Sequence, residues 1–305
     1  MKNKDEDAGG SYMKKILITG GSGFVGRNTS EFLKKYTQYQ VFAPTSKELN
    51  CIDEREVRAY LEREKFDIVL NFAVYGDGID QKKDGTKILE YNLRMFHNFA
   101  RYNSLYEKMI YAGSGAEYDK RFPICSVKEE EIGQSIPVDQ YGLMKYTVGQ
   151  IIETTPNIYN LRLFGIFGKY EYWPVKFISN ICCKAIYDLP LSVRQNVYFD
   201  YLWIEDFLNM LLKFLEIEKP EYHTYNMVSG QRIDLITLCH IVNKVSNKNL
   251  RILSGKEGYG NEYTANNDRI LNELGGFEMT SMEQAVEKLY SWYLTQEIDL
   301  YRLIY

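Results

Sequence analysis

The sequence predicts an α/β protein in which a doubly wound parallel sheet is followed by a smaller α/β domain. Short apolar runs alternate with amphipathic helical patterns throughout the first half of the chain. A glycine-rich turn follows the first apolar run, and the connections between successive elements are short. Strand–helix–strand repetition of this kind favours right-handed crossovers and a sheet with helices on both faces.

The expected elements divide the chain into two parts. Strands are expected at 16–19, 40–43, 67–72, 109–112 and 158–164, and helices at 24–36, 54–64, 87–103 and 140–154. The second half is less regular, with strands expected at 198–203 and 225–228 and helices at 205–217, 235–246 and 282–293. We therefore expect a first domain at 13–168 and a second mainly at 169–305, with 198–228 returning to the first.

Composition and charge exclude several classes of protein. The 305 residues carry a formal net charge of −4 without a long basic run, so binding to nucleic acid has no electrostatic support. Five cysteines and three histidines show no metal-ligand spacing, which predicts reduced thiols and no metal site. No segment approaches the roughly 20 apolar residues that span a bilayer. We expect a cytoplasmic protein.

The N-terminal segment differs from the rest. Residues 1–12 are charged, contain glycine and lack the apolar centre of a signal peptide. We expect a disordered extension there, with the folded chain beginning near Met13.

The first chemical signal is the turn Gly20-Gly21-Ser22-Gly23-Phe24-Val25-Gly26. Gly20 allows a tight turn, Gly23 lets the backbone approach a pyrophosphate, and Gly26 allows close helix-on-strand packing. The helix that begins there directs its amides and dipole at the phosphate. An ordinary strand–helix connection is the alternative for this turn taken alone, but the strand before it and the helix after it favour a dinucleotide site.

The second signal is a proton-transfer set of three residues. Tyr141 and Lys145 share one face of an expected helix, and Ser114 directly follows an apolar strand. Strand ends of this kind are where doubly wound sheets place their ligands. A phenol titrates near ~10, so a neighbouring ammonium group is needed to lower its pKa towards neutrality. A second pair with the same spacing, Tyr172 and Lys176, is interrupted by a proline and has no such serine before it.

Taken together, these motifs resemble those of the extended short-chain dehydrogenases/reductases, in particular the NAD-dependent epimerase/dehydratase family that modifies nucleotide sugars. The resemblance runs from about residue 13 to 293 and implies a Rossmann-like first domain. Later landmarks are Leu161-Arg162-Leu163-Phe164-Gly165, Phe199-Asp200-Tyr201-Leu202-Trp203 and Tyr225-Asn226-Met227. The stretch 45–53 is similar to that of GDP-L-fucose synthases and dTDP-4-dehydrorhamnose reductases.

The resemblance implies a role for each candidate residue. Tyr141 would be the general acid/base, Lys145 would lower its pKa and hold the cofactor ribose, and Ser114 would bind the substrate oxygen. The implied cofactor contacts are Gly20, Gly23, Phe24, Val25, Gly26, Ser46, Asp53, Ala73, Asn92, Tyr141 and Lys145. The implied substrate contacts are Ser114, Gly115, Phe164, Arg194, Asn196, Asn226 and Arg269.

Departures from the family patterns reduce the number of reactions that this chain could catalyse. The 4,6-dehydratases carry an acid where this chain has Ala116, and the fucose synthases carry a cysteine there for epimerisation. Glu117 is one position out, on the opposite side if the segment is extended. We therefore expect reduction of a 4-keto(-6-deoxy) nucleotide sugar. A 4-epimerase with tightly bound NAD and a non-catalytic dinucleotide-binding protein are the alternatives.

Two further expectations concern the cofactor and the assembly. Thr45 stands where a carboxylate would bind the ribose 2′-hydroxyl, which favours NADP mildly over NAD. The helices at 87–103 and 140–154 carry more apolar residues than one buried stripe requires; they are Leu93, Phe96, Met144, Val148, Ile151 and Ile152. In resembling enzymes the equivalent helices meet in a four-helix bundle, so a homodimer is expected.

Overall fold

The computed structural model describes residues 13–36, 38–76 and 84–304. The expected N-terminal extension, residues 1–12, lies outside the described residues.

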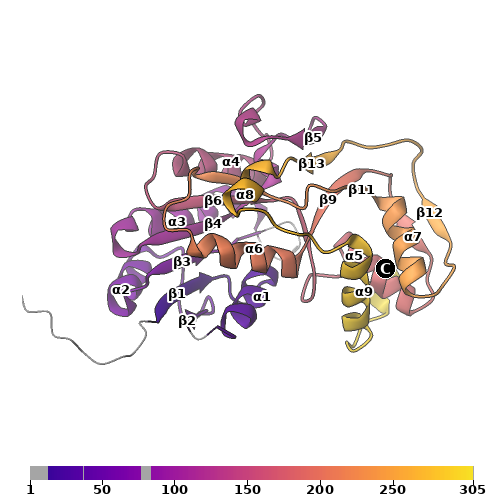
Figure 1. The fold of residues 1–305 in the computed structure, drawn as a ribbon, viewed down its shortest axis with the longest axis horizontal. Coiled ribbons are helices and arrows are strands. Elements are labelled where there is room, and N and C mark those ends of the chain that lie inside the picture. The colour runs from indigo at the N-terminus through magenta and orange to yellow at the C-terminus, as the bar shows by residue number, and fades with distance from the viewer. Residues whose placement is uncertain (1–12, 37, 77–83, 305) are drawn as a thin grey trace, which may run out of the picture.

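The centre of the first lobe is a six-stranded parallel sheet with the strand order β10-β6-β4-β3-β1-β2 (Figure 1). Its strands, in chain order, are β1 (Lys14–Thr19), β2 (Tyr39–Phe42), β3 (Ile68–Asn71), β4 (Lys108–Ser114), β6 (Ile158–Leu163) and β10 (Thr224–Met227). The strand order reverses at β1, which lies between β2 and β3 in the sheet. The carboxyl ends of the parallel strands therefore meet at one edge, where ligands of such sheets bind.

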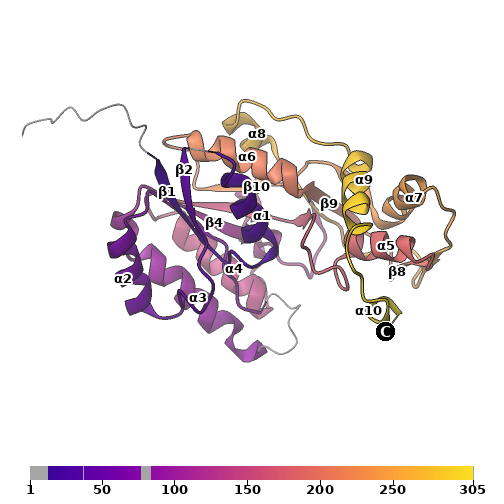
Figure 2. The same cartoon turned by 90° about the horizontal axis from the view of Figure 1, so that it is seen from below.

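Helices cover both faces of this sheet (Figure 2). Helices α2 (Glu54–Glu64), α3 (Ile88–Ala100) and α4 (Gln140–Ile152) lie on one side, and α1 (Phe24–Leu33) and α6 (Ile204–Glu216) lie on the other. Successive strand residues alternate between the two cores, as a pleated strand requires. Ile16 and Ile18 pack in the core that includes α6, whereas Leu17 packs in the core that includes α3 and α4.

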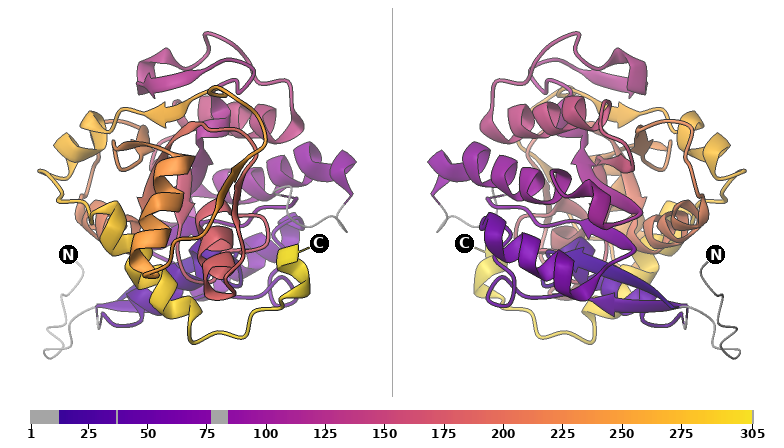
Figure 3. Two further views of the ribbon diagram at one scale, coloured as in Figure 1. Left: turned by 90° about the vertical axis from the view of Figure 1, so that its right-hand side faces the viewer. Right: turned by 90° about the vertical axis from the view of Figure 1, so that its left-hand side faces the viewer.

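The second lobe is built on shorter strands. Its main sheet joins β5 (Ile124–Val127), β13 (Tyr263–Ala265), β9 (Tyr198–Trp203) and β11 (Arg232–Asp234), and β7 (Gly165–Phe167) pairs with β9. A separate pair is formed by β8 (Leu191–Val193) and β12 (Ile252–Ser254). The helices are α5 (Phe177–Ile186), α7 (Leu235–Val245), α8 (Asp268–Glu273), α9 (Met282–Tyr293) and α10 (Tyr301–Ile304). Figure 3 shows the end formed by α7 and α9 on the left and the opposite end, with α2 and α3, on the right.

The predicted fold class is confirmed, and the differences lie mostly in the second lobe. Within 198–228, β10 joins the six-stranded sheet and α6 packs on α1, whereas β9 belongs to the second sheet. Helices α5, α8 and α10 and strands β5, β7, β8, β11, β12 and β13 were not predicted. Across the described part of the chain, we find no helix with the length and apolar character that a membrane crossing requires.

Candidate active site

A cavity of about 840 Å³ lies between the two lobes. It is lined by the glycine-rich turn, by the ends of β4 and β6, by α4, and by residues 170–176 and 261–263 from the second half of the chain. Its volume is within the range of small-molecule sites. The predicted residues that line it are Gly20, Gly23, Phe24, Val25, Gly26, Ser114, Tyr141, Lys145 and Phe164.

The glycine-rich turn presents the free N-terminus of α1 to this cavity. Gly20 has a positive φ of 68°, and a Cβ there would lie 2.9 Å from the Cα of Ala73. A Cβ at Gly26 would collide with the carbonyl oxygen of Gly20, so α1 packs against the turn only because residue 26 has no side chain. Gly23 caps α1 without a side-chain hydrogen bond, and the first turn of the helix has no acidic residue. Open amides and the helix dipole make this end suitable for a phosphate.

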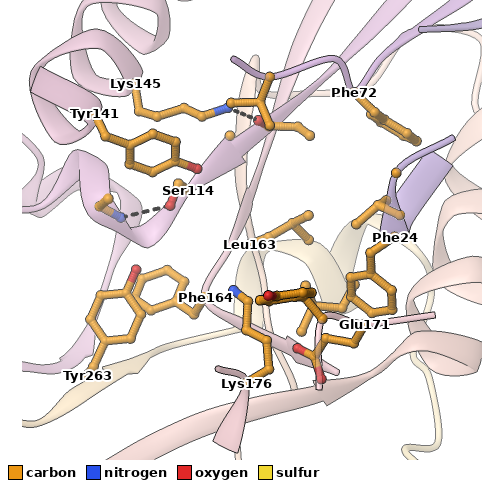
Figure 4. Close-up of a pocket in the computed structure, with 18 of the residues that line it drawn as sticks. Phe24, Phe72, Ser114, Tyr141, Lys145, Leu163, Phe164, Glu171, Lys176 and Tyr263 are labelled. Atoms are coloured by element: carbon orange, nitrogen blue, oxygen red, sulfur yellow. Dashed lines mark hydrogen bonds between the residues drawn. The ribbon is translucent and has the colours of Figure 1, made fainter. Parts of the chain in front are cut away.

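Ser114, Tyr141 and Lys145 come together at the carboxyl end of β4 (Figure 4). Ser114 is the last residue of β4, and its Oγ accepts a hydrogen bond from Ala116 N at 3.1 Å. Tyr141 and Lys145 lie on α4, whose first turn is capped by Asp139 accepting from Gly142 N at 2.9 Å. Figure 4 shows the Tyr141 hydroxyl directed towards Ser114. The structure therefore brings all three predicted proton-transfer residues to one wall of the cavity.

The ammonium group of Lys145 is almost completely buried. Its Nζ donates to Ala112 O at 2.6 Å and lies 4.4 Å from the centre of the Tyr111 ring and 5.6 Å from that of Tyr141. Burial lowers the pKa of Lys145 to about 8, and the negative charge of Glu117 acts in the opposite direction. The positive charge beside Tyr141 stabilises a phenolate more than a phenol.

Glu117 turns away from the cavity and is fully buried. The segment Gly115–Glu117 forms a 3-10 turn, so the extended conformation considered from the sequence is wrong. The carboxylate of Glu117 accepts from Arg162 Nε at 2.6 Å, from Asn160 Nδ2 at 3.1 Å and from Ser114 N at 3.1 Å. A buried pair with this many hydrogen bonds holds the end of β4 in place. Ala116 lines the cavity instead, and it carries no ionisable group.

Sequence reasoning missed four charged residues on the cavity wall, which are Lys120, Glu171, Lys176 and Glu262. Glu171 is buried, and its carboxylate accepts from Ser179 Oγ at 2.6 Å. Burial raises the pKa of Glu171 to about 7, against the lowering effects of Ser179 and Lys176. Lys176 caps α5, which begins at Phe177, so Tyr172 and Lys176 do not share a helix. Figure 4 shows Glu171 on the side of Phe24, across the cavity from Ser114.

Four predicted cofactor residues have other positions. Asp53 caps α2 by accepting from Arg55 N at 2.8 Å and from Glu56 N at 3.1 Å. Asn92 lies within α3, where its side chain accepts from the backbone N of Tyr75 and donates to the backbone O of the same residue. Ala73 backs the glycine-rich turn. Neither these three residues nor Ser46, which is exposed after β2, belong to the described lining of the large cavity.

The loop after β2 carries a carboxylate that the sequence pattern did not place. Glu48 Oε2 accepts from the backbone N and from the hydroxyl of Thr45, each at 2.8 Å. Arg27 does not turn to this loop, because its guanidinium stacks 3.6 Å from the Tyr170 ring centre and its Nε donates to Glu31. A carboxylate beside Thr45 weakens the argument for NADP from the sequence.

The predicted substrate residues are dispersed. Phe164 lines the large cavity, and Gly115 lies behind it where a Cβ would strike Phe164 and Tyr263. Arg194 lines a separate cavity of about 590 Å³, and the neighbouring Asn196 is buried with its amide donating to Asp234 at 3.0 Å.

The remaining two substrate residues also lie elsewhere. Asn226 is fully buried, and its Nδ2 donates to Val127 O at 3.0 Å. Arg269 lies in another cavity of about 490 Å³, where it faces Glu129 and Glu130 at 3.6 and 3.3 Å. The geometry therefore does not gather Arg194, Asn226 and Arg269 around the proton-transfer residues.

Comparison with known proteins agrees with this fold and site. The NAD dependent epimerase/dehydratase family matches residues 16–227. The chain is 31% identical to GDP-L-colitose synthase of Yersinia pseudotuberculosis, over 93% of this chain and 99% of that protein. It is 24% identical to GDP-L-fucose synthase of Azorhizobium caulinodans, over 92% and 97%. The chain belongs to the NAD dependent epimerase/dehydratase family, as an enzyme of the extended short-chain dehydrogenase/reductase type.

Solved structures show the same fold. GDP-mannoheptose C4 reductase from Campylobacter jejuni, with NADP bound, superposes with a TM-score of 0.80 at 17% identity, covering 94% of this chain and 100% of that one. UDP-glucose 4-epimerase from Thermotoga maritima, with UDP-glucose, superposes with a TM-score of 0.76 at 17% identity, covering 92% and 98%.

Proposed function

We propose that this protein reduces a 4-keto-6-deoxy nucleotide sugar to the corresponding alcohol with a nicotinamide dinucleotide. The observation that carries the proposal is the meeting of Ser114, Tyr141 and Lys145 on one wall of a cavity whose other wall is the glycine-rich turn. The names of the relatives support the substrate class, because GDP-L-colitose synthase and GDP-L-fucose synthase act on nucleotide sugars.

The residues of the cavity fit a dinucleotide. The open N-terminus of α1 would hold the pyrophosphate, and Lys145 and Tyr141 would lie beside the nicotinamide ribose. When bound, the reduced cofactor supplies the hydride. NADPH remains our preferred donor, supported by the NADP in the reductase of similar fold, whereas Glu48 beside Thr45 favours NADH.

The chain itself supplies the proton and the positive charge that stabilises the group left after the proton is transferred. Tyr141 would donate the phenolic proton to the carbonyl oxygen, and Ser114 would donate a second hydrogen bond to the same oxygen. The resulting phenolate would be stabilised by the buried ammonium group of Lys145, which lies 5.6 Å from the Tyr141 ring centre. One hydride and one proton complete the reduction.

The surroundings of Ser114 favour reduction over dehydration or 3,5-epimerisation. Both of those reactions need a further acid or base beside the sugar ring, and Ala116 supplies none. Glu117 is fully buried in its pair with Arg162. Glu171 lies on the side of Phe24, across the cavity from Ser114, whereas the amine of Lys176 lies nearer to Phe164 (Figure 4).

The test is to incubate the protein with GDP-, dTDP- and CDP-linked 4-keto-6-deoxy sugars in deuterated water, with NADPH or NADH. We expect one cofactor oxidised per alcohol formed, with one of the three nucleotides preferred. Deuterium at C3 or C5 of the product would contradict a simple reductase. Turnover of a non-keto sugar without net cofactor oxidation, together with NAD that co-purifies, would support a 4-epimerase instead. Cofactor binding without any turnover would support a non-catalytic protein.

A further inference from the structure

A second phenol lies on the same wall of the cavity as the proton-transfer residues. Tyr263, the first residue of β13, lines the cavity with Ser114 and Tyr141 although it lies 122 residues beyond Tyr141 in the chain. Figure 4 shows its hydroxyl directed towards Ser114. The sequence offered no motif that would single out this tyrosine among 26.

Packing fixes the position of the Tyr263 ring. The ring centres of Tyr263 and Phe164 are 4.8 Å apart, and those of Tyr263 and Phe199 are 5.7 Å apart. A Cβ at Gly115 would fall inside van der Waals distance of both the Tyr263 hydroxyl and the Phe164 ring. The phenol therefore approaches the end of β4 only because residue 115 is glycine.

The two phenols beside Ser114, Tyr141 and Tyr263, differ in their electrostatic surroundings. Burial raises the pKa of Tyr263 well above its ordinary value, and the neighbouring Tyr141 adds to this effect, while Ser114 opposes it. Tyr263 therefore stays protonated and neutral, and it can donate a hydrogen bond at any working pH. Tyr141, by contrast, has the ammonium group of Lys145 beside it. One phenol is equipped to transfer a proton and the other to hold a neutral oxygen.

The chemistry of the substrate identifies that oxygen. A carbonyl oxygen accepts hydrogen bonds through two lone pairs, which Ser114 and Tyr141 would occupy. In a 4-keto-6-deoxy pyranose, the carbon neighbours of C4 are C3, with its hydroxyl, and C5, with a methyl group. We infer that Tyr263 binds the C3 hydroxyl of the 4-keto sugar and makes the enzyme prefer substrates that carry it. This inference rests on the proposed function.

The test combines a change in the protein with a change in the substrate. Tyr263→Phe removes one oxygen and leaves the ring packed against Phe164. We compare kcat and KM for a 4-keto-6-deoxy nucleotide sugar and its 3-deoxy counterpart. The unchanged protein should prefer the 3-hydroxy sugar roughly 10- to 100-fold, because a site built for a hydroxyl leaves polar groups unpaired without it.

The variant should lose most of this preference, because its KM should rise more for the 3-hydroxy sugar than for the 3-deoxy sugar. Tyr187→Phe is the matched control, since Tyr187 lies in the second lobe and donates to Ile298 O, away from the cavity. Equal slowing of both sugars by Tyr263→Phe, or an unchanged preference, would overturn the assignment.

A binding measurement separates this inference from the proposed reaction. Calorimetry of the cofactor-bound protein with 6-deoxy and 3,6-dideoxy nucleotide sugars at the alcohol level needs no turnover. A preference that the variant loses would support Tyr263 even if no keto sugar were reduced, and only the proposed reaction would then fail. The same affinity ratio in both proteins would overturn the Tyr263 assignment while leaving the reductase intact.

Discussion

The buried ammonium group of Lys145 determines the electrostatics of the proton-transfer wall. Its Nζ donates a hydrogen bond to Ala112 O and lies 4.4 Å from the ring centre of Tyr111 and 5.6 Å from that of Tyr141. With a pKa lowered to about 8 by burial, Lys145 begins to lose its charge within the working range of many enzymes. The support that it gives to the Tyr141 phenolate is therefore present below that pH and fades above it.

Replacing Tyr141 with phenylalanine should remove nearly all turnover while leaving cofactor affinity close to normal. Proton transfer by a positioned group contributes roughly 100- to 10,000-fold, and each factor of ten corresponds to about 1.4 kcal/mol of barrier. Steady-state kinetics and cofactor titration measure both quantities. Tyr146→Phe is the matched control, because Tyr146 lies on the same helix but not on the described cavity wall. Retention of more than half the rate would remove Tyr141 from the mechanism.

Glu171 should make the stability of the cofactor-free protein fall as pH rises. Its folded pKa of about 7 lies above the ordinary value of 4.5, so the folded state holds the proton more tightly than the unfolded state. The contribution of protonated Glu171 to the free energy of unfolding is fully present below about pH 4.5 and is lost as the pH rises through 7. The shift corresponds to at most about 3 kcal/mol.

Glu171→Gln isolates this effect, because the amide oxygen still accepts from Ser179 and carries no charge. Urea unfolding at pH 5 and pH 8 should show the variant gaining about 1–3 kcal/mol over the unchanged protein at pH 8 and little at pH 5. A difference that does not change with pH would show that the Glu171 carboxylate is not destabilised by burial.

Local spacing decided which site residues could be predicted. Tyr141 and Lys145 are one helical turn apart, and Ser114 ends an apolar strand, so each has a position that the sequence pattern defines. Glu171 and Lys176 reach the cavity from an irregular segment and Tyr263 from a three-residue strand of the second lobe, where no periodicity relates them to the first lobe. Arg194 and Arg269 are ordinary charged residues in sequence, and only the three-dimensional structure places them in separate cavities.

At the scale of elements, the strands and helices that were predicted differ from those that were missed in length and apolar character. All strands of the six-stranded sheet were predicted, because each contains a short run that is mostly apolar in sequence, and β3 and β6 are buried along their whole length. The missed strands β8, β11, β12 and β13 each have three residues, too few for an alternating pattern to emerge. Helix α5 was missed because Pro174 and the aromatic residues before it resemble a loop, although its own sequence is apolar and mostly buried.

At the scale of the whole molecule, a homodimer through α3 and α4 remains a prediction. Phe96, Met144, Val148 and Ile152 are buried inside the chain, where the two helices pack on each other and on the sheet. Packing within the chain thus explains most of the apolar surplus seen in sequence. The partly buried Leu93 and Ile151 are left as the residues of that set that a partner could cover.

Light scattering at micromolar concentration should give twice the chain mass of 35.8 kDa. The double change Leu93→Glu and Ile151→Glu should produce single chains, since an isologous contact brings each charge to the interface twice. Leu294→Glu, at a leucine that is 59% exposed beyond α9, is the control and should leave the mass unchanged. A single-chain mass for the unchanged protein would count against the bundle.

The chain position of β10 has a consequence for synthesis on the ribosome. Strand β6 pairs with β4 on one side and with β10 on the other, yet β10 follows β6 by about sixty residues. Until those residues emerge, β6 in the nascent first lobe has one unpaired edge, whose backbone groups are a template for pairing with other chains. At roughly 5–20 residues per second this interval lasts several seconds. During that interval the growing chain already has its glycine-rich turn and its Tyr–Lys pair, while β6 still lacks its second partner strand.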